Sequence, residues 1–343
     1  MNLTLKDIAQ ALGISIATVS KALKNYSDVS PKTKARVLEY VTQVNFKPNF
    51  QASYLRTQKT KLVGVILPDI NHDFFNKILK GIITAAETQD YNVLVLCSNE
   101  SFEKEVEQIH DLLQRKVDGI FLSIAKNTYR YEHLEAIKAA NVPLVLFDRI
   151  AKVVNSIRVA IDDQQAAFMA TEHLIQQGCK NIAHFRGDLI PQMSIDRFLG
   201  YKRALEHYGL PFHKEWAFIC AENSIENGKM NAEILLKSAP EIDGLFTITD
   251  LVAVGAISYF KEQGRRIPKD IAVIGFSNWA IAPLVTPTLS SVEQNGYLMG
   301  LKVVELFFKA LEKSNENEEP PIYESAIIPS QLIIRDSSLR IKN

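Results

Sequence analysis

Histidine, cysteine and paired carboxylates are the residue types that most often bind metals or transfer protons, and their spacing here supports neither role. The seven histidines show no metal-ligand spacing. The three cysteines, Cys97, Cys179 and Cys220, are far apart without a CxxC pair, which is typical of buried thiols in a reducing compartment. Asp162 and Asp163 are adjacent, so they make a poor acid–base pair, and a loop or helix-cap role is the better interpretation.

Motifs of catalysis and cofactor binding are missing as well. The chain contains no GxGxxG, GxxxxGKS/T, HExxH or GxSxG segment, the patterns that hold nucleotides and zinc or expose a serine nucleophile. We therefore predict that the chain is not an enzyme, that it needs no cofactor, and that it has neither catalytic nor metal-binding residues.

The charges are distributed unevenly along the chain. The first sixty residues carry nine Lys and Arg against three Asp and Glu, whereas the other 283 carry 30 against 36. The whole chain is formally neutral, so its average charge conceals this difference. A basic segment on an acidic body is expected when one end of a protein meets a polyanion such as a nucleic acid.

Length and composition set the broad class. A chain of 343 residues with 47% hydrophobic and 23% charged residues is expected to form two or three globular domains. The first ten residues, MNLTLKDIAQ, do not form a signal peptide, and no stretch approaches 18 uncharged apolar residues. We therefore expect a cytoplasmic protein with no membrane partner.

Two different patterns divide the chain. In the first segment, apolar residues recur at helical spacing, with candidate N-caps at Thr4, Ser15 and Ser30 and a glycine, Gly13, in the first turn. This predicts three short helices, the first two crossing tightly. From Leu62 onward, apolar runs alternate with helical segments, which predicts parallel sheets covered on both faces and ligands beyond the carboxyl ends of the strands. The expected strands are Leu62–Leu67, Asn92–Leu96, Gly119–Leu122, Val142–Phe147, Ile182–Phe185, Gly244–Ile248 and Ile271–Phe276.

The segment TLKDIAQALGISIATVSKAL, residues 4–23, resembles the helix-turn-helix signature of the LacI/GalR family of bacterial transcriptional regulators. Leu12-Gly13 stands where the family usually has Ala-Gly. Further resembling segments follow in order over essentially the full chain. They are VSPKTKARV, FKPN, LVGVILPDINHDFF, VDGIFL, PLVLFDR, VAIDD, RFLGYKRAL, IPKDIAVIGF and TPTLSSVEQ.

The resemblance implies an all-α helix-turn-helix head joined to an α/β sensor of two doubly wound parallel-sheet lobes, similar to periplasmic binding proteins. The head would span residues 1–47, and a hinge helix with its linker residues 48–61. The effector-binding and dimerisation domain would span residues 62–343. Its first lobe would contain about 62–161 with 291–323, and its second about 162–290 with 324–343.

The resemblance also assigns DNA contacts in the head. The second helix would enter the major groove, where Ile16 and Ala17 offer only apolar contacts, for instance to a thymine methyl group. The alternative is that these two side chains pack within the head. Lys21 would reach a guanine or a phosphate, and Thr18 and Ser20 would contact phosphates or pack. The implied DNA-binding set also includes Thr4, Ser15 and Asn25.

In the implied hinge helix, Leu55 would wedge between base steps of the minor groove. The alternative for Leu55 is ordinary packing of the linker. Where many members have Ala-Arg-Ser-Leu, this chain has Ala52-Ser53-Tyr54-Leu55, so an arginine contact is lost, for which Arg56 is a substitute. The DNA-binding residues implied in this segment are Asn49, Ala52, Leu55 and Arg56.

In the sensor, the resemblance implies a cleft in which carboxylate and guanidinium groups bind sugar hydroxyls and aromatic rings stack on the sugar face. Two alternatives are open: Arg197 and Asp250 pair with each other or with other charges, and Asp148-Arg149 is a loop ion pair. Many sugar-binding members have Asp where this chain has Ser277, so the effector is open. The implied effector-binding residues are Asp69, Phe74, Asp148, Arg149, Arg197, Phe198, Asp250, Ser277 and Gln294.

The resemblance favours a homodimeric repressor of carbohydrate-use genes, which binds a pseudo-palindromic double-stranded DNA operator under control of a sugar or sugar-phosphate effector. The alternatives are an activator, or a global regulator that responds to a purine or a protein co-effector. A solute-binding protein fits less well, because of the basic head and the missing signal peptide. The chain has no leucine-heptad tail of the kind that makes tetramers, so we expect a dimer.

Overall fold

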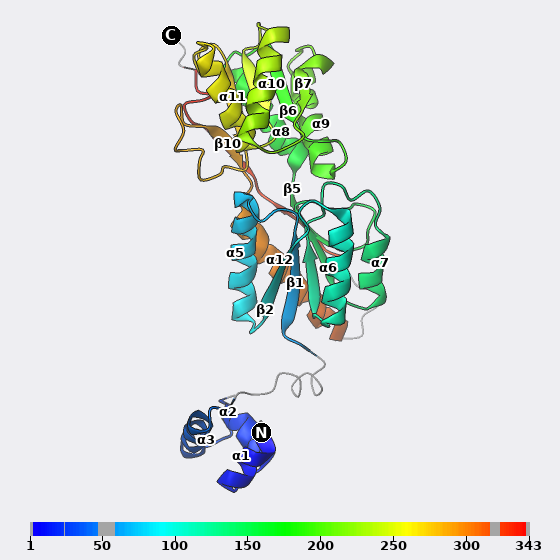
Figure 1. The fold of residues 1–343 in the computed structure, drawn as a ribbon, viewed down its shortest axis with the longest axis vertical. Helices are drawn as coiled ribbons and strands as arrows, with labels where there is room; N and C mark the ends of the chain where they lie inside the picture. Colours follow the sequence, from blue (N-terminus) through cyan, green and yellow to red (C-terminus); the bar gives the residue numbers. More distant parts are fainter. Residues whose placement is uncertain (1–2, 24, 47–58, 316–322, 341–343) are drawn as a thin grey trace. The chain divides into compact units, whose positions relative to one another are not determined.

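The computed structural model describes residues 3–23, 25–46, 59–315 and 323–340. The chain divides into two compact units, Met1–Thr60 and Lys61–Asn343, each described by itself below (Figure 1). The expected helical head and two-lobed α/β body are confirmed. None of the helices in the described ranges is long and apolar enough to cross a membrane.

Three helices form the head: α1 (Leu5–Leu12), α2 (Ile16–Leu23) and α3 (Pro31–Gln43). The predicted caps are confirmed, because the Thr4 and Ser30 side chains accept backbone N–H groups at the starts of α1 and α3. Gly13 ends α1 with a φ of 65°, in the left-handed region that glycine adopts without strain. The buried head core consists of Ile8, Ala9, Leu12, Val19, Ala22, Val29 and Val37.

The first lobe is a six-stranded parallel sheet with the order β11-β5-β4-β3-β1-β2. Its strands are β1 (Leu62–Leu67), β2 (Asn92–Cys97), β3 (Gly119–Leu122), β4 (Leu144–Phe147), β5 (Ile157–Ile161) and β11 (Ser325–Ile328). Its helices are α5 (Asp73–Thr88), α6 (Phe102–Gln114), α7 (Glu132–Ala139) and α12 (Gly296–Asn315).

The second lobe repeats this topology with the order β12-β10-β9-β8-β6-β7. Its edge strand β12 runs antiparallel to β10, so the expectation of a wholly parallel sheet is wrong at this edge. The strands are β6 (Ile182–Arg186), β7 (Ala217–Ile219), β8 (Gly244–Thr247), β9 (Ala272–Phe276), β10 (Ser290–Glu293) and β12 (Gln331–Ile333). The helices are α8 (Asp163–Gln176), α9 (Gln192–His207), α10 (Ile225–Ser238), α11 (Asp250–Glu262) and the short 3-10 helix η1 (Lys214–Trp216).

Helices cover both faces of each sheet (Figure 1). In the first lobe, α5 and α12 pack on one face and α6 and α7 on the other. In the second, α8 and α9 pack opposite α10 and α11. The helices α5 and α12 touch backbone to backbone at Gly81 and Gly300, where a Cβ on Gly300 would lie 2.1 Å from the Ile78 carbonyl oxygen. This contact anchors α5, and with it the loop that follows β1.

The chain passes between the lobes three times, and two expected lobe boundaries are wrong by a few residues. Strand β10, residues 290–293, belongs to the second sheet, so the chain enters the first lobe after 293 instead of at 291. Strand β11, residues 325–328, pairs with β5 in the first sheet, so the chain returns after 328 instead of at 324. Both crossings follow the last backbone pairing of a strand, which the sequence pattern does not mark.

Candidate functional site

The helix α2 has one exposed face. Val19 and Ala22 are buried in the head core, whereas Ile16 is 47% exposed and Ala17 is also exposed. The two apolar side chains therefore do not pack within the head, which removes that alternative. An exposed isoleucine at the start of a short helix is available for apolar contact with a partner.

The polar residues predicted in the head differ in what their side chains contact. Thr4 and Ser15 act locally, since Ser15 Oγ accepts the Thr18 N–H at 3.0 Å and Thr4 forms a reciprocal cap with Asp7. Asn25 is exposed with a φ of 57°, and its side-chain oxygen accepts the Lys34 ammonium at 2.9 Å. Ser20 is half-buried on α2.

The ammonium of Lys21 forms an ion pair with Asp28. The hydrogen bond to Asp28 and its charge raise the pKa of Lys21. Both side chains are about half exposed, so the pair is accessible to a competing anion. Any base or phosphate contact of Lys21 must therefore replace or share its contact with Asp28. Asn49, Ala52, Leu55 and Arg56, predicted in the hinge helix, lie outside the described residues.

A cavity of about 260 Å³ lies in the body, bordered by loops from both lobes. Its lining residues follow the carboxyl ends of the strands in both sheets, as expected for ligand sites in doubly wound folds. Those with polar or aromatic side chains used below are Asp69, His72, Phe74, Glu100, Lys126, Asp148, Arg149, Asp188, Arg197, Glu222, Thr249, Ser277 and Gln294. We refer to this cavity as the cleft.

Seven of the nine predicted effector-binding residues line the cleft, and Phe198 and Asp250 do not. Phe198 packs instead in an aromatic cluster, with its ring centroid 5.8 Å from that of Phe212 and 6.4 Å from that of Tyr201. Arg197 and Phe198 are consecutive on α9, so their side chains leave the helix in different directions, and only Arg197 lines the cleft.

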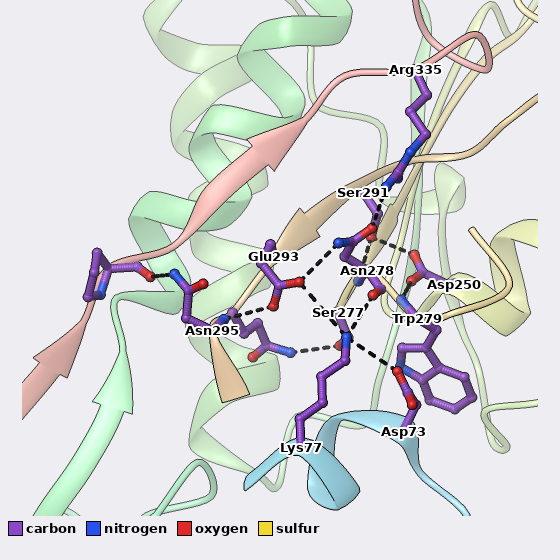
Figure 2. A network of polar contacts seen from close by, with 12 residues as sticks. Asp73, Lys77, Asp250, Ser277, Asn278, Trp279, Ser291, Glu293, Asn295 and Arg335 are labelled. Atoms are coloured by element: carbon purple, nitrogen blue, oxygen red, sulfur yellow. Dashed lines mark hydrogen bonds and ion pairs between the residues drawn. The ribbon is translucent and has the colours of Figure 1, made fainter. Parts of the chain in front are cut away.

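Asp250 lies behind the cleft, in a polar network at the 277–279 loop (Figure 2). Its carboxylate accepts the Trp279 N–H at 2.6 Å and the Ser291 hydroxyl at 2.6 Å. Burial raises its pKa to about 7, opposed by these hydrogen bonds. The prediction that Asp250 faces an effector is therefore wrong, because the residue before it, Thr249, points into the cleft.

Arg197 is the buried centre of the second lobe's side of the cleft. Its guanidinium donates to Asp163 Oδ1 at 2.7 Å, to the Ile248 carbonyl at 3.3 Å and to Gln294 Oε1 at 3.3 Å. It also stacks over the Phe276 ring at 3.6 Å. Arg197 therefore does not pair with Asp250, but it does pair with another charge, Asp163, as the alternative allowed, while it also lines the cleft.

Arg149 pairs with Glu100, and the alternative of an Asp148–Arg149 ion pair is also wrong. The Arg149 Nη1 donates to Glu100 Oε1 at 2.9 Å and to Oε2 at 2.6 Å. Burial opposes the charge of Arg149, but the attraction of Glu100 and the neighbouring aspartates raises its pKa. Burial likewise opposes the charge of Glu100, whose pKa Arg149 nevertheless holds below its ordinary value.

Two of the residues that line the cleft have an unusual backbone conformation, and two have side-chain oxygens without a hydrogen-bond partner among the described residues. Asp148 and Ser277 have φ values of 56° and 92°, a left-handed region unusual for non-glycine residues and often found at functional sites. The buried Asp148 carboxylate forms no hydrogen bond or ion pair with the described residues, and burial raises its pKa. The buried Thr249 hydroxyl has no hydrogen-bond partner among them either. A buried hydroxyl without a partner, beside a cavity that a carboxylate also lines, is expected where a polar ligand binds.

Lysines of the first lobe contact the second lobe around the cleft. Lys77 of α5 donates to the Asn278 carbonyl at 2.9 Å (Figure 2), and Lys126 donates to the Ala221 carbonyl at 3.3 Å. Lys152 forms an ion pair with Asp196 at 3.3 Å. The rings of His72 and Trp279 also meet across the lobes, with centroids 4.5 Å apart. Burial lowers the pKa of His72 to about 3, so this ring is neutral.

Sequence reasoning missed several lining residues, including Glu100, Lys126 and Thr249. Each of them follows a strand by two to four residues, so the rule that ligands lie beyond the carboxyl ends of strands would have marked them. Within the described ranges, His, Cys, Asp and Glu side chains form no group of three or more that could hold a metal ion.

The family model "Periplasmic binding proteins and sugar binding domain of LacI family" matches residues 60–336, and "Bacterial regulatory proteins, lacI family" matches residues 4–49. The chain is 34% identical over 314 residues to "Catabolite control protein A" of Priestia megaterium, covering 91% of this chain and 94% of that protein. It is 32% identical over 336 residues to the "Ribose operon repressor" of Halalkalibacterium halodurans, covering 98% and 97%.

Among solved structures, the lac repressor dimer bound to operator and the anti-inducer ONPF is similar, with a TM-score of 0.85. The match covers 99% of this chain and 100% of that chain at 23% identity, so it supports the fold. Family models that together span the head and the body, and relatives above 30% identity over nearly the full length, establish the family. The chain belongs to the LacI family of DNA-binding transcriptional regulators, which are not enzymes.

Proposed function

We propose that this regulator is a homodimeric repressor of carbohydrate-use genes whose operator affinity changes when a small hydroxylated effector binds in the cleft. The observation that carries the proposal is a pair of polar groups on opposite lobes of one cavity: the buried Thr249 hydroxyl, which has no partner among the described residues, and the carboxylate of the lining residue Asp148. A sugar offers several hydroxyls on a rigid ring and can bind both groups at once.

The head supports the DNA-binding half of the proposal. It presents the exposed Ile16 and Ala17 on α2, with Lys21 on the same helix. One such helix contacts only a few base pairs, so a two-fold dimer on a pseudo-palindromic operator would double the recognised site. Asn49, Ala52, Leu55 and Arg56 are proposed as the hinge contacts to that operator.

We infer the coupling between effector binding and DNA binding from the position of the cleft, which both lobes line. A ligand that contacts both lobes stabilises one lobe arrangement over another, and its effect on DNA affinity equals its difference in affinity for the two arrangements. The direct lobe-to-lobe contacts of Lys77, Lys126 and Lys152 are the interactions that such a ligand would strengthen or replace.

The relatives support two versions of this function. The "Ribose operon repressor" supports control of one sugar operon. The "Catabolite control protein A" favours a broader regulator as the second candidate. The number of genomic sites bound by the purified chain separates the two, since an operon repressor should select one or a few sites and a broad regulator many.

The experiment is a thermal-shift screen of the full chain against neutral sugars, sugar phosphates and purines, followed by operator-binding titrations on duplexes selected from genomic DNA. A ligand that binds the native state raises the melting temperature. Thr249→Val removes the cleft hydroxyl at constant shape and should weaken that ligand. Ser123→Ala is the matched control, because its buried hydroxyl is also unpartnered among the described residues but does not line the cleft. Equal losses in both variants would refute the assignment of the cleft.

A further inference from the structure

The carboxylate of Glu100 lies against the Arg149 guanidinium at the cleft. Both of its oxygens accept from Arg149 Nη1, and Oε2 also accepts the Lys126 backbone N–H at 2.8 Å. An arginine donor fork is the group that proteins use to bind phosphate and carboxylate ligands. In this chain, one of the protein's own carboxylates already holds one arm of that fork, Nη1, and balances its charge.

The backbone that carries Glu100 is strained. Asn99 and Glu100 have φ values of 50° and 60°, and two consecutive non-glycine residues in this region are uncommon. The Glu100 N–H donates to the Pro68 carbonyl at 3.0 Å, which ties this turn to the loop after β1. Strain of this kind persists where the surrounding structure requires the side chain in one place, here beside Arg149.

The rest of the cleft also disfavours anions. The second buried arginine, Arg197, is paired with Asp163 at 2.7 Å. The lining includes five carboxylates, Asp69, Glu100, Asp148, Asp188 and Glu222, and three cations, Lys126, Arg149 and Arg197. An entering phosphate would therefore meet an excess of negative charge, and it would have to compete with Glu100 for Nη1 and for the positive charge of Arg149.

We propose that Glu100 is the specificity-determining residue of the cleft: by holding Nη1 of Arg149 and balancing its charge, it excludes phosphorylated and carboxylated ligands and leaves uncharged, hydroxylated compounds as effectors. This inference rests on the proposed effector function and narrows it from sugars and sugar phosphates to uncharged sugars or polyols. It also predicts which single change converts the cleft into an anion site.

The test uses the full chain, with inorganic phosphate as the probe and chloride at matched ionic strength as the reference. Glu100→Gln keeps the size of the side chain and releases the charge of Arg149. It should bind phosphate about tenfold more tightly than the wild type, or better, by calorimetric titration, and phosphate should raise its melting temperature more. Glu262→Gln is the matched control, because the same substitution frees the charge of a cation, Lys229, at an exposed pair that does not line the cleft. It should behave as the wild type.

Three outcomes would overturn the proposal. They are an equal phosphate gain in Glu262→Gln, a gain in Glu100→Gln that survives the addition of Arg149→Met, and a wild-type chain that binds phosphate or sugar phosphates with a Kd below about 1 mM. The last needs no variant, so a poorly folding Glu100→Gln leaves the test intact. Failure of the proposed function is distinguishable, because it appears as a wild type that no neutral sugar stabilises, whatever the phosphate titration shows.

Discussion

Replacement of Arg197 tests the electrostatic centre of the cleft. Arg197 and Asp163 are almost fully buried and joined at 2.7 Å, so Arg197→Met leaves a buried carboxylate without its partner. Loss of one member of such a pair costs about 3–5 kcal/mol. Methionine retains much of the packing on Phe276, so we expect about 4 kcal/mol of lost unfolding free energy at pH 8.

The stability cost of Arg197→Met should depend on pH. Burial raises the pKa of Asp163 to about 7 even with the arginine present, so removing that charge raises the pKa further. The carboxyl then takes up a proton as the pH falls, and the penalty for an unpaired buried charge disappears. The cost of Arg197→Met should therefore shrink as the pH falls from 8 to about 7, the pKa of Asp163 in the wild type, and level off below it, where the carboxyl is protonated in both proteins.

Urea unfolding at several pH values measures both quantities. The double variant Asp163→Asn with Arg197→Met should lose less stability than Arg197→Met alone, since no charge is left unpaired. Lys229→Met is the control, because Lys229 and Glu262 form an exposed pair and its loss should cost under about 1 kcal/mol. A cost of Arg197→Met below about 1 kcal/mol at pH 8, or strict additivity in the double variant, would refute the reasoning.

Three other predictions follow from particular contacts. Gly300→Ala should cost about 1–3 kcal/mol in urea unfolding, because the new Cβ would meet the Ile78 carbonyl, while Ala at the exposed Glu305 of the same helix should cost under about 0.5 kcal/mol. Asp250 has a pKa raised to about 7, so the native state keeps a proton that the unfolded chain releases near 3.8, and stability falls as the pH rises between these values. Asp250→Asn should reduce that fall by at most about 4 kcal/mol, and an unchanged pH profile would contradict the assignment. In the head, Lys21→Ala should weaken specific DNA binding by about 1–3 kcal/mol. Asp28→Ala frees the Lys21 ammonium and should therefore tighten binding in anisotropy titrations. Weaker binding of Asp28→Ala would contradict the idea that Asp28 and DNA compete for Lys21.

The sequence predicted β1, β2, β3, β4, β6, β8 and β9, most of which are buried on both faces. Runs such as Leu62–Leu67 and Gly119–Leu122 are continuous and apolar, and each lies within a sheet. Five strands were missed: β7, β11 and β12 are edge strands with three or four residues of mixed burial, and β5 and β10 are short interior strands whose sequences contain Arg158 or two serines. Their pairing depends on contacts with distant segments, which a local pattern does not contain. Because β10 and β11 were among the missed strands, two expected lobe boundaries were wrong by a few residues.

The location of the cleft was predictable from the sequence, whereas its lining residues were predictable only in part. The family resemblance supplied seven residues that line it, and the strand-end rule extends to the missed ones. The ion pairs were not predictable, because Arg197 and Asp163 are 34 positions apart and Arg149 and Glu100 are 49 apart. Asp162 and Asp163 illustrate the difference: Asp162 caps α8, the predicted type of role, but Asp163 is the buried partner of Arg197.

The central claim is that occupancy of the cleft alters DNA binding by the head. The most direct measurement is fluorescence anisotropy of a selected genomic duplex titrated with the full chain, at several salt concentrations, with and without a neutral sugar that stabilises the protein. The account predicts affinity that falls steeply with salt, from counterion release, and that changes at least about tenfold on adding the sugar, an effect absent in Thr249→Val and retained in Ser123→Ala. Sequence-specific binding that the sugar leaves unchanged, while the sugar demonstrably occupies the cleft, would contradict it.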